Sequence, residues 1–215
     1  MTSCNIRFDQ LDDSFVKELQ PSFNDLPETD HKDGKYRLRK YALVEINNTY
    51  GYSLDFTYKQ LDVDTFNQSS EYNKYQGDTD RKFQIINERV LFSGALSEAL
   101  NKFRRVGGLQ LGDKIHVHQM RVVASDEAQV SPEGIHQDGY EFVCFFGINR
   151  HNITGGELML YHGQDEQPFL SWPTPNGTMV TINDDDLWHN GSPIQTIDKN
   201  DKGYVDLFVF TAGEA

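Results

Sequence analysis

Metal-binding side chains gather at one motif in the second half of the chain. His136 and Asp138 flank Gln137, and His189 follows further along. Residues i and i+2 of an extended strand point to the same side, so His136 and Asp138 can bind one ion while Gln137 faces away. Two imidazoles and one carboxylate suit ferrous iron and leave coordination positions open for other ligands. The pattern predicts a metal site capable of oxygen chemistry, formed by His136, Asp138 and His189.

A His-x-Asp motif is common by chance, and these residues also have a simpler interpretation. His136 could be a hydrogen-bonded surface histidine, and Asp138 a turn former before Gly139. Other polar groups in this half are weaker candidates. His116 and His118 alternate along one strand and read as ordinary strand residues, although His118 could line the site. The acidic run 184–186 reads as a solvated turn rather than a hard-cation site.

The bulk properties describe a globular chain and exclude several functions. The 215 residues include 12% aromatics and carry a net charge of −13, which argues against nucleic acid and anionic membranes as partners. No apolar run has the ~20 residues of a membrane span, and the first residues lack the features of a signal peptide. Cys4 and Cys144 do not form a disulfide framework. We expect a cytoplasmic protein, a compartment that also suits ferrous iron.

The elements that must position these residues change in character near Gly107 and Gly108. We expect a single domain over residues 1–215, with a helical and mixed part at 1–107 and a β-rich core at 108–215 that carries the metal site. In the first part we expect helices at Asp9–Gln20 and Asn87–Val106. Strands are expected between them, at Tyr36–Ile46 and Tyr52–Leu61.

The second part reads as successive short strands separated by turn-forming residues. Such spacing is typical of a sandwich or jelly roll, and a double-stranded β-helix brings ligands from distant strands to one barrel mouth. The predicted class is mainly β with flanking helices, a cupin-like double-stranded β-helix. Its strands are expected at Ile115–Ala124, Tyr140–Asn149, Glu157–His162, Phe169–Trp172, Gly177–Ile182 and Tyr204–Ala212.

Several motifs together resemble the bacterial 2-oxoglutarate-dependent iron dioxygenases whose members hydroxylate free amino acids such as isoleucine. The similarity extends from about Tyr36 onward and is densest between His118 and Ile194. The matching stretches are Arg37–Arg39, His118–Arg121, Gly134–Gly139, Asn149–Arg150, Gly155–Glu157, Trp188–His189 and Pro193–Ile194.

The resemblance implies both the fold and the chemistry. It implies a double-stranded β-helix in which His136, Asp138 and His189 bind Fe(II). It implies 2-oxoglutarate and O2 as co-substrates, with succinate and carbon dioxide formed while a small substrate, most simply a free L-amino acid, is hydroxylated. We place the substrate beside Arg39, His118 and Trp188, although Trp188 also fits a core position and Arg39 an exposed strand edge.

The chain departs from the family pattern on the last strand. The family carries an arginine there, followed by Asp, apolar residues and Thr, and that arginine binds the distal carboxylate of 2-oxoglutarate. Here the stretch 204–211 reads YVDLFVFT, which puts Val205 at the position of the arginine. A buried dicarboxylate without a cation is costly. Three explanations are possible. A cation from another strand could replace the arginine, the protein could use a different keto acid or none, or it could have lost its activity.

Arg121, with Gln119 beside it, is the first candidate for the replacement cation. The period of two on the strand 115–123 puts Gln119 and Arg121 on one face with apolar residues. Arg121 could bind the co-substrate, the substrate carboxylate or an acidic side chain of the protein. Alternatives to the whole assignment are an iron oxygenase that does not use 2-oxoglutarate and a non-catalytic cupin-like metal-binding or sensor domain.

Overall fold

The computed structural model describes residues 5–47, 56–125 and 128–214. A large antiparallel sheet forms the centre of the molecule, and the short strand β6 (Gln84–Ile85) pairs in parallel with one of its members. Among the described residues, no helix is long and apolar enough to cross a membrane. The strands of the large sheet, in spatial order, are β1 (Ile6–Gln10), β12 (Thr178–Asn183), β8 (Tyr140–His151), β15 (Tyr204–Glu214), β7 (Lys114–Val123), β2 (Arg37–Asn47) and β3 (Thr57–Leu61).

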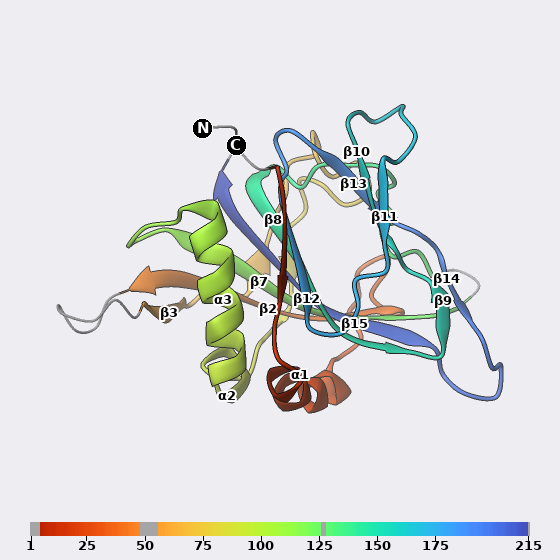
Figure 1. Ribbon diagram of the computed structural model, residues 1–215, viewed down its shortest axis with the longest axis horizontal. Coiled ribbons are helices and arrows are strands. Elements are labelled where there is room, and N and C mark those ends of the chain that lie inside the picture. Colours follow the sequence, from red (N-terminus) through yellow and green to blue (C-terminus); the bar gives the residue numbers. More distant parts are fainter. Residues whose placement is uncertain (1–4, 48–55, 126–127, 215) are drawn as a thin grey trace.

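Smaller sheets lie across one face of the large sheet. A three-stranded sheet has the order β11, β10, β13, and β14 pairs with β9. The remaining short strands, β4 (Thr65–Phe66) and β5 (Arg81–Lys82), pair with each other. Together the two layers form the double-stranded β-helix that was expected from the strand spacing (Figure 1). The bounds are β11 Leu170–Trp172, β10 Leu158–Tyr161, β13 Trp188–Gly191, β14 Ile194–Thr196 and β9 Ile153–Gly155.

Helices cover the opposite face of the large sheet (Figure 1). α3 (Gly94–Gly107) begins at Ser93, whose hydroxyl accepts a hydrogen bond from the Leu96 amide, and ends at Gly108 in the left-handed conformation with φ 63°. Its apolar side packs on the sheet in the largest core cluster. The shorter helices are α1 (Asp13–Leu19), the 3₁₀ turn η1 (Gln20–Asp25) and α2 (Glu88–Leu91).

The period of two along β15 separates this core from the site. Phe208 and Phe210 are fully buried in the cluster beneath the helices. The alternate residues Val205, Leu207 and Val209 point into a pocket between the two β layers. One strand therefore stabilises the fold with one face and lines the site with the other.

The structure corrects some of the expected boundaries. Residues 6–10 form the edge strand β1, so the first helix begins only at Asp13, after the N-cap position Asp12. The expected helix Asn87–Val106 is two helices, because Ser93 caps a new one. Part of the expected strand Tyr52–Leu61 lies outside the described residues, and its remainder is β3.

Candidate metal centre and pocket

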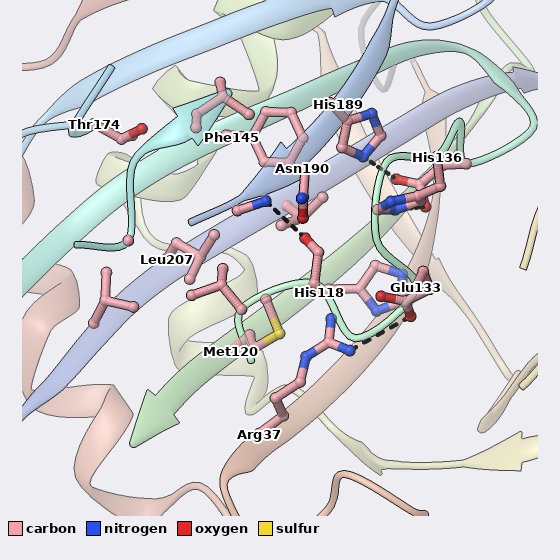
Figure 2. A pocket seen from close by; sticks show the side chains of 18 of the residues that line it. Arg37, His118, Met120, Glu133, His136, Phe145, Thr174, His189, Asn190 and Leu207 are labelled. Carbon is pink, nitrogen blue, oxygen red and sulfur yellow. Dashed lines mark hydrogen bonds and ion pairs between the residues drawn. The ribbon is translucent and has the colours of Figure 1, made fainter. Parts of the chain in front are cut away.

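The sheet pairing brings the two histidines of the predicted triad together. His136 and His189 form an isolated antiparallel bridge in which each amide donates to the other carbonyl, at 3.0 and 2.9 Å. Asp138 completes the group, with its carboxylate oxygens 3.7 Å from His136 Nε2 and 3.6 Å from His189 Nε2. One ligand atom from each residue lies within 4.8 Å of the others (Figure 2). The spacing suits a shared ion.

Supporting groups orient both imidazoles toward the centre. The Gly134 carbonyl lies 2.9 Å from His136 Nδ1, and Oδ1 of Asp184 lies 3.0 Å from His189 Nδ1. A carbonyl and a carboxylate only accept, so both contacts favour a proton on Nδ1. Each Nε2 would then be left to bind a metal, once His136 has lost its second proton. Asp138 is held by the side-chain amide of Gln68, which donates to its Oδ1 at 3.0 Å.

Asp184 has a structural position that contradicts the expected solvated turn. Its side chain is 0% exposed, and its second oxygen accepts hydrogen bonds from the backbone amides of Asp138 and Gly139. The carboxylate therefore links both halves of the triad, since it contacts His189 and fixes the loop that carries Asp138. Only its neighbours Asp185 and Asp186 are exposed, as expected.

The charged groups of the triad shift one another's pKa values. Burial by itself lowers the pKa of His136, but Asp138, Glu133 and the Gly134 carbonyl raise it, to about 9. Burial raises the pKa of Asp138, yet its contacts with His136 and His189 hold it below the usual range. A half-buried carboxylate that remains ionised, together with two imidazoles, is a donor set that fits Fe(II).

A pocket that is partly open to solvent extends from the triad between the β layers. Figure 2 shows Thr174 and Leu207 on one side of it, and Glu133 and His136 on the other. Several polar atoms on its wall are buried without a hydrogen-bond partner among the described residues: His118 Nδ1, Asn190 Oδ1, Thr211 Oγ1 and Glu133 Oε2. Such atoms are costly unless a ligand or water satisfies them, so the pocket is built for a polar ligand.

Buried arginines line the pocket on the side of β2. Arg37 lies 2.7 Å from Oδ2 of Asp33 and 3.5 Å from Oε1 of Glu133, so it is paired. Arg39 is 8% exposed and forms no ion pair with any described carboxylate. Its hydrogen bond goes to the sulfur of Met120, at 3.3 Å.

A third arginine, Arg81 of β5, adds to the positive charge. It is 2% exposed, and its guanidinium donates to Oε1 of Gln68 at 2.7 Å. Burial, followed by the charges of Arg37 and Arg81, lowers the pKa of Arg39 to about 9, so Arg39 still carries its charge at neutral pH. Among the described residues, Asp33 and Glu133 are the carboxylates that act on Arg39, and they already form ion pairs with Arg37; Asp138, which acts on Arg81, belongs to the triad.

The structure brings some of the predicted binding residues to the pocket and leaves others outside. Arg39 and His118 line it, and Val205 does so as well, at the place where the family arginine was expected. The positions of Gln119 and Arg121 correct the sequence interpretation. They do share one face of β7, but the pocket is lined by the other face, which carries His118 and Met120.

Gln119 and Arg121 bind other side chains of the protein instead of lining the pocket. Arg121 forms two hydrogen bonds with Asp206, at 2.6 and 2.8 Å, which is the structural ion pair considered from the sequence. Gln119 donates to the Ser22 hydroxyl at 2.7 Å. Trp188 is also outside the pocket, because His189 beside it points inward.

Sequence reasoning missed several contributors to the site. Gln68 and Arg81 lie in segments with no recognisable motif, and only the folded chain brings them to the triad. Glu133 directly precedes the matching stretch Gly134–Gly139 but was not singled out. Asn190 follows His189 and could have been noticed as its neighbour. Asp184 carried a readable signal, because a metal-bound histidine usually has a carboxylate as its second partner.

Comparisons with known proteins agree with this fold. The chain is similar to the crystal structure of a bsmA homolog from Methylobium petroleophilum PM1, with TM-score 0.79 and 21% identity over 94% of this chain and 82% of that one. It is also similar to IDO from Bacillus thuringiensis, with TM-score 0.77 and 16% identity over 98% and 94% of the two chains. A third similar structure is the Fe(II)/(alpha)ketoglutarate-dependent dioxygenase TqaL, with TM-score 0.67 and 13% identity over 98% and 83%.

These identities are low, so the structural similarities show the fold alone. No curated protein matches the chain significantly. The sequence profile of the 2OG-Fe dioxygenases, however, matches residues 20–211, which is most of the chain. That match, together with a β-helix holding two histidines and an aspartate, places the protein in the 2OG-Fe dioxygenase family, whose reactions use Fe(II), 2-oxoglutarate and O2.

Proposed function

We propose that the protein hydroxylates a small carboxylate-bearing molecule, most simply a free L-amino acid. His136, Asp138 and His189 would hold Fe(II), supported by Asp184 and Gln68. The bound metal and 2-oxoglutarate would supply oxygen activation coupled to release of succinate and carbon dioxide. The protein's own contribution would be to orient the substrate and to keep water from the reacting carbon.

The observation that carries this proposal is the charge of Arg39, which forms no ion pair with any carboxylate in the described part of the chain. A buried cation without an anionic partner is costly, whereas Arg37 beside it is balanced by Asp33 and Glu133. An incoming carboxylate would supply the missing anion. The guanidinium of Arg39 presents a planar fork that matches a carboxylate.

Acceptor atoms in the same pocket suit the ammonium group of an amino acid. Glu133 Oε2 and Asn190 Oδ1 are buried and have no hydrogen-bond partner among the described residues. Both line the pocket, as Arg39 does. A zwitterion would satisfy the two acceptors and the guanidinium at once, whereas a plain carboxylic acid would satisfy only the guanidinium.

Apolar side chains occupy other parts of the wall and suit a hydrocarbon side chain. Phe145 lies in edge-to-face contact with His189, with ring centroids 5.1 Å apart. Phe66 packs in the same way on His118, at 4.5 Å. Burial and the neighbouring Arg39 lower the pKa of His118 well below its usual value, so the imidazole is neutral and adds no cation there. We therefore favour amino acids with aliphatic side chains.

A panel of amino acids tests the proposal. The protein is incubated with Fe(II), 2-oxoglutarate and O2, and succinate release is measured for each amino acid and for its deaminated and decarboxylated analogues. We expect release above the uncoupled background with one or a few aliphatic amino acids. Equal stimulation by the decarboxylated analogue would refute the role of the carboxylate.

Arg39→Met provides the matching variant. We expect substrate affinity to fall at least ~30-fold, because a buried ion pair truncated on one side typically costs 2–5 kcal/mol. The melting temperature of the substrate-free protein should stay the same or rise, because a buried charge without a carboxylate partner is removed. Arg105→Met, a change at an exposed arginine of α3, serves as the control. Unchanged affinity in Arg39→Met would refute the assignment.

A further inference from the structure

The family's co-substrate needs a cation near Val205, and a bulge in the neighbouring strand supplies one. Val205 and Leu207 are two residues apart on β15, and both line the pocket. Their partners on β8 are Arg150 and Gly147, which are three residues apart. The pairing shifts between Asp206 and Leu207, where β8 contains one extra residue.

The extra residue turns Arg150 into the pocket. Without the bulge, the period of two that brings Gly147 inward would bring Asn149 inward next and direct Arg150 away. With it, Arg150 stands opposite Val205 on the inner face, and both residues line the pocket. A β-bulge commonly re-aims a side chain in this way.

The guanidinium of Arg150 is fixed but not neutralised. It donates to the carbonyls of Gly155 and Gly156, the second at 3.0 Å, and neither carbonyl carries a formal charge. No described carboxylate forms an ion pair with it, although Glu157 acts on it at longer range. These two bonds use only part of the five N–H donors of an arginine, so a carboxylate can still bind.

Competing cations are less well placed. Arg37, Val122, Val205 and Arg150 form one row across β2, β7, β15 and β8. Neighbouring strands lie ~4.8 Å apart, so the backbone of Arg37 is three strand spacings, or ~14 Å, from the backbone of Arg150. Arg37 is already paired with Asp33 and Glu133, whereas Arg150 lies on the strand directly beside Val205.

We infer that Arg150 binds the distal carboxylate of 2-oxoglutarate and so replaces the absent last-strand arginine. The inference rests on the use of 2-oxoglutarate by this protein. Arg150 acts as a binding residue that positions the keto acid relative to the triad. The bulge aims this cation into the pocket from β8, three strands away from β2, so Arg39 on β2 remains available to the substrate.

Binding measurements with two keto acids test the inference without relying on activity. The protein is loaded anaerobically with Fe(II) and titrated with 2-oxoglutarate or with 2-oxovalerate, which has the same chain length but ends in a methyl group. The visible absorbance of the iron–keto acid complex gives each dissociation constant. We expect Arg150→Met to weaken 2-oxoglutarate at least ~30-fold and to change 2-oxovalerate less than ~3-fold.

A second variant guards against a simple folding defect, because Arg150 also ties β8 to the turn at Gly155. Adding Val205→Arg to Arg150→Met puts a cation back at the family position, and we expect it to restore most of the affinity for 2-oxoglutarate. Arg39→Met should leave 2-oxoglutarate binding unchanged. Equal loss for both keto acids in Arg150→Met, or a selective loss of 2-oxoglutarate in Arg39→Met, would overturn the inference.

The wild-type titration separates this inference from the use of the co-substrate itself. Tight binding of 2-oxoglutarate with no effect of Arg150→Met would refute only the role of Arg150. A wild-type protein that binds 2-oxovalerate as tightly as 2-oxoglutarate would also refute it, because no cation would then recognise the distal carboxylate. Binding of neither keto acid would contradict the use of 2-oxoglutarate, and the role of Arg150 with it.

Discussion

Replacing Asp184 by Asn should weaken the metal centre although Asp184 is not one of its ligands. The carboxylate uses both oxygens: Oδ1 lies 3.0 Å from His189 Nδ1, and Oδ2 accepts from the amides of Asp138 and Gly139. An asparagine has one oxygen and one NH2 group. In either orientation, the NH2 group of the asparagine must therefore point at a group that also donates, which is either His189 Nδ1–H or the amides of Asp138 and Gly139.

Either orientation of the asparagine damages the triad. If its oxygen faces Asp138, its NH2 group faces His189 Nδ1 and favours the tautomer in which Nε2 is protonated and cannot bind a metal. If its oxygen faces His189, the loop of Asp138 loses its acceptor at a fully buried position. Removing such a supporting partner typically lowers metal affinity 10–100-fold, or about 1.4–2.7 kcal/mol.

Competition with a chromophoric chelator under anaerobic conditions measures the Fe(II) dissociation constants. Asp185→Asn is the matched control, because it makes the same chemical change at the next residue, which is exposed. We expect Asp185→Asn to bind Fe(II) as the wild type does, and Asp184→Asn to bind it at least ~10-fold more weakly. An Asp184→Asn protein that folds normally and binds Fe(II) within threefold of the wild type would refute the reasoning.

Further expectations concern stability and the loop of the triad. Phe103→Ala in the fully buried core beneath the large sheet should lower the free energy of unfolding by about 3–5 kcal/mol, measured by urea denaturation. Burial, with a smaller effect of Lys114, lowers the pKa of His116 to about 4. Because the unfolded histidine takes up its proton first, stability is highest above pH ~6.5 and falls as the pH drops toward 4, by up to ~3 kcal/mol; His116→Gln should flatten this part of the pH profile, and an unchanged slope would contradict the cause. Gly139→Ala should reduce both melting temperature and Fe(II) affinity, because φ is 78° and a Cβ would lie 2.5 Å from the Tyr72 ring; a variant equal to the wild type in both would contradict this.

The fold could be predicted from the sequence wherever local patterns agree with the tertiary structure. Turn residues separate the strands of the second half, and the glycines that follow Val106 end α3, as predicted. The cap at Ser93, which divides the expected helix in two, was not predicted. The edge strand β1 was missed because an isolated five-residue strand has no local signal that distinguishes it from the start of a helix. It is strand because it pairs with β12.

The predictions for the site divide in the same way. The period of two placed Gln119 and Arg121 together on one face of β7, but period alone cannot say which face meets the pocket and which meets the helices. Tertiary packing decides which face meets the pocket, and on the other face Arg121 forms two hydrogen bonds with Asp206. The buried position of Asp184 also depends on contacts with residues distant in the chain.

The sequence by itself determined the types of ligand for the metal, their spacing and the valine at the expected place of the arginine, because these are properties of residues in order. The tertiary structure decided which charges share one cavity. It brought Arg39 and Arg81 together from separate strands, and it used a bulge in β8 to turn Arg150 inward beside Val205. The direction of a side chain after a bulge depends on how two strands pair, and pairing between distant segments is not encoded in any local pattern.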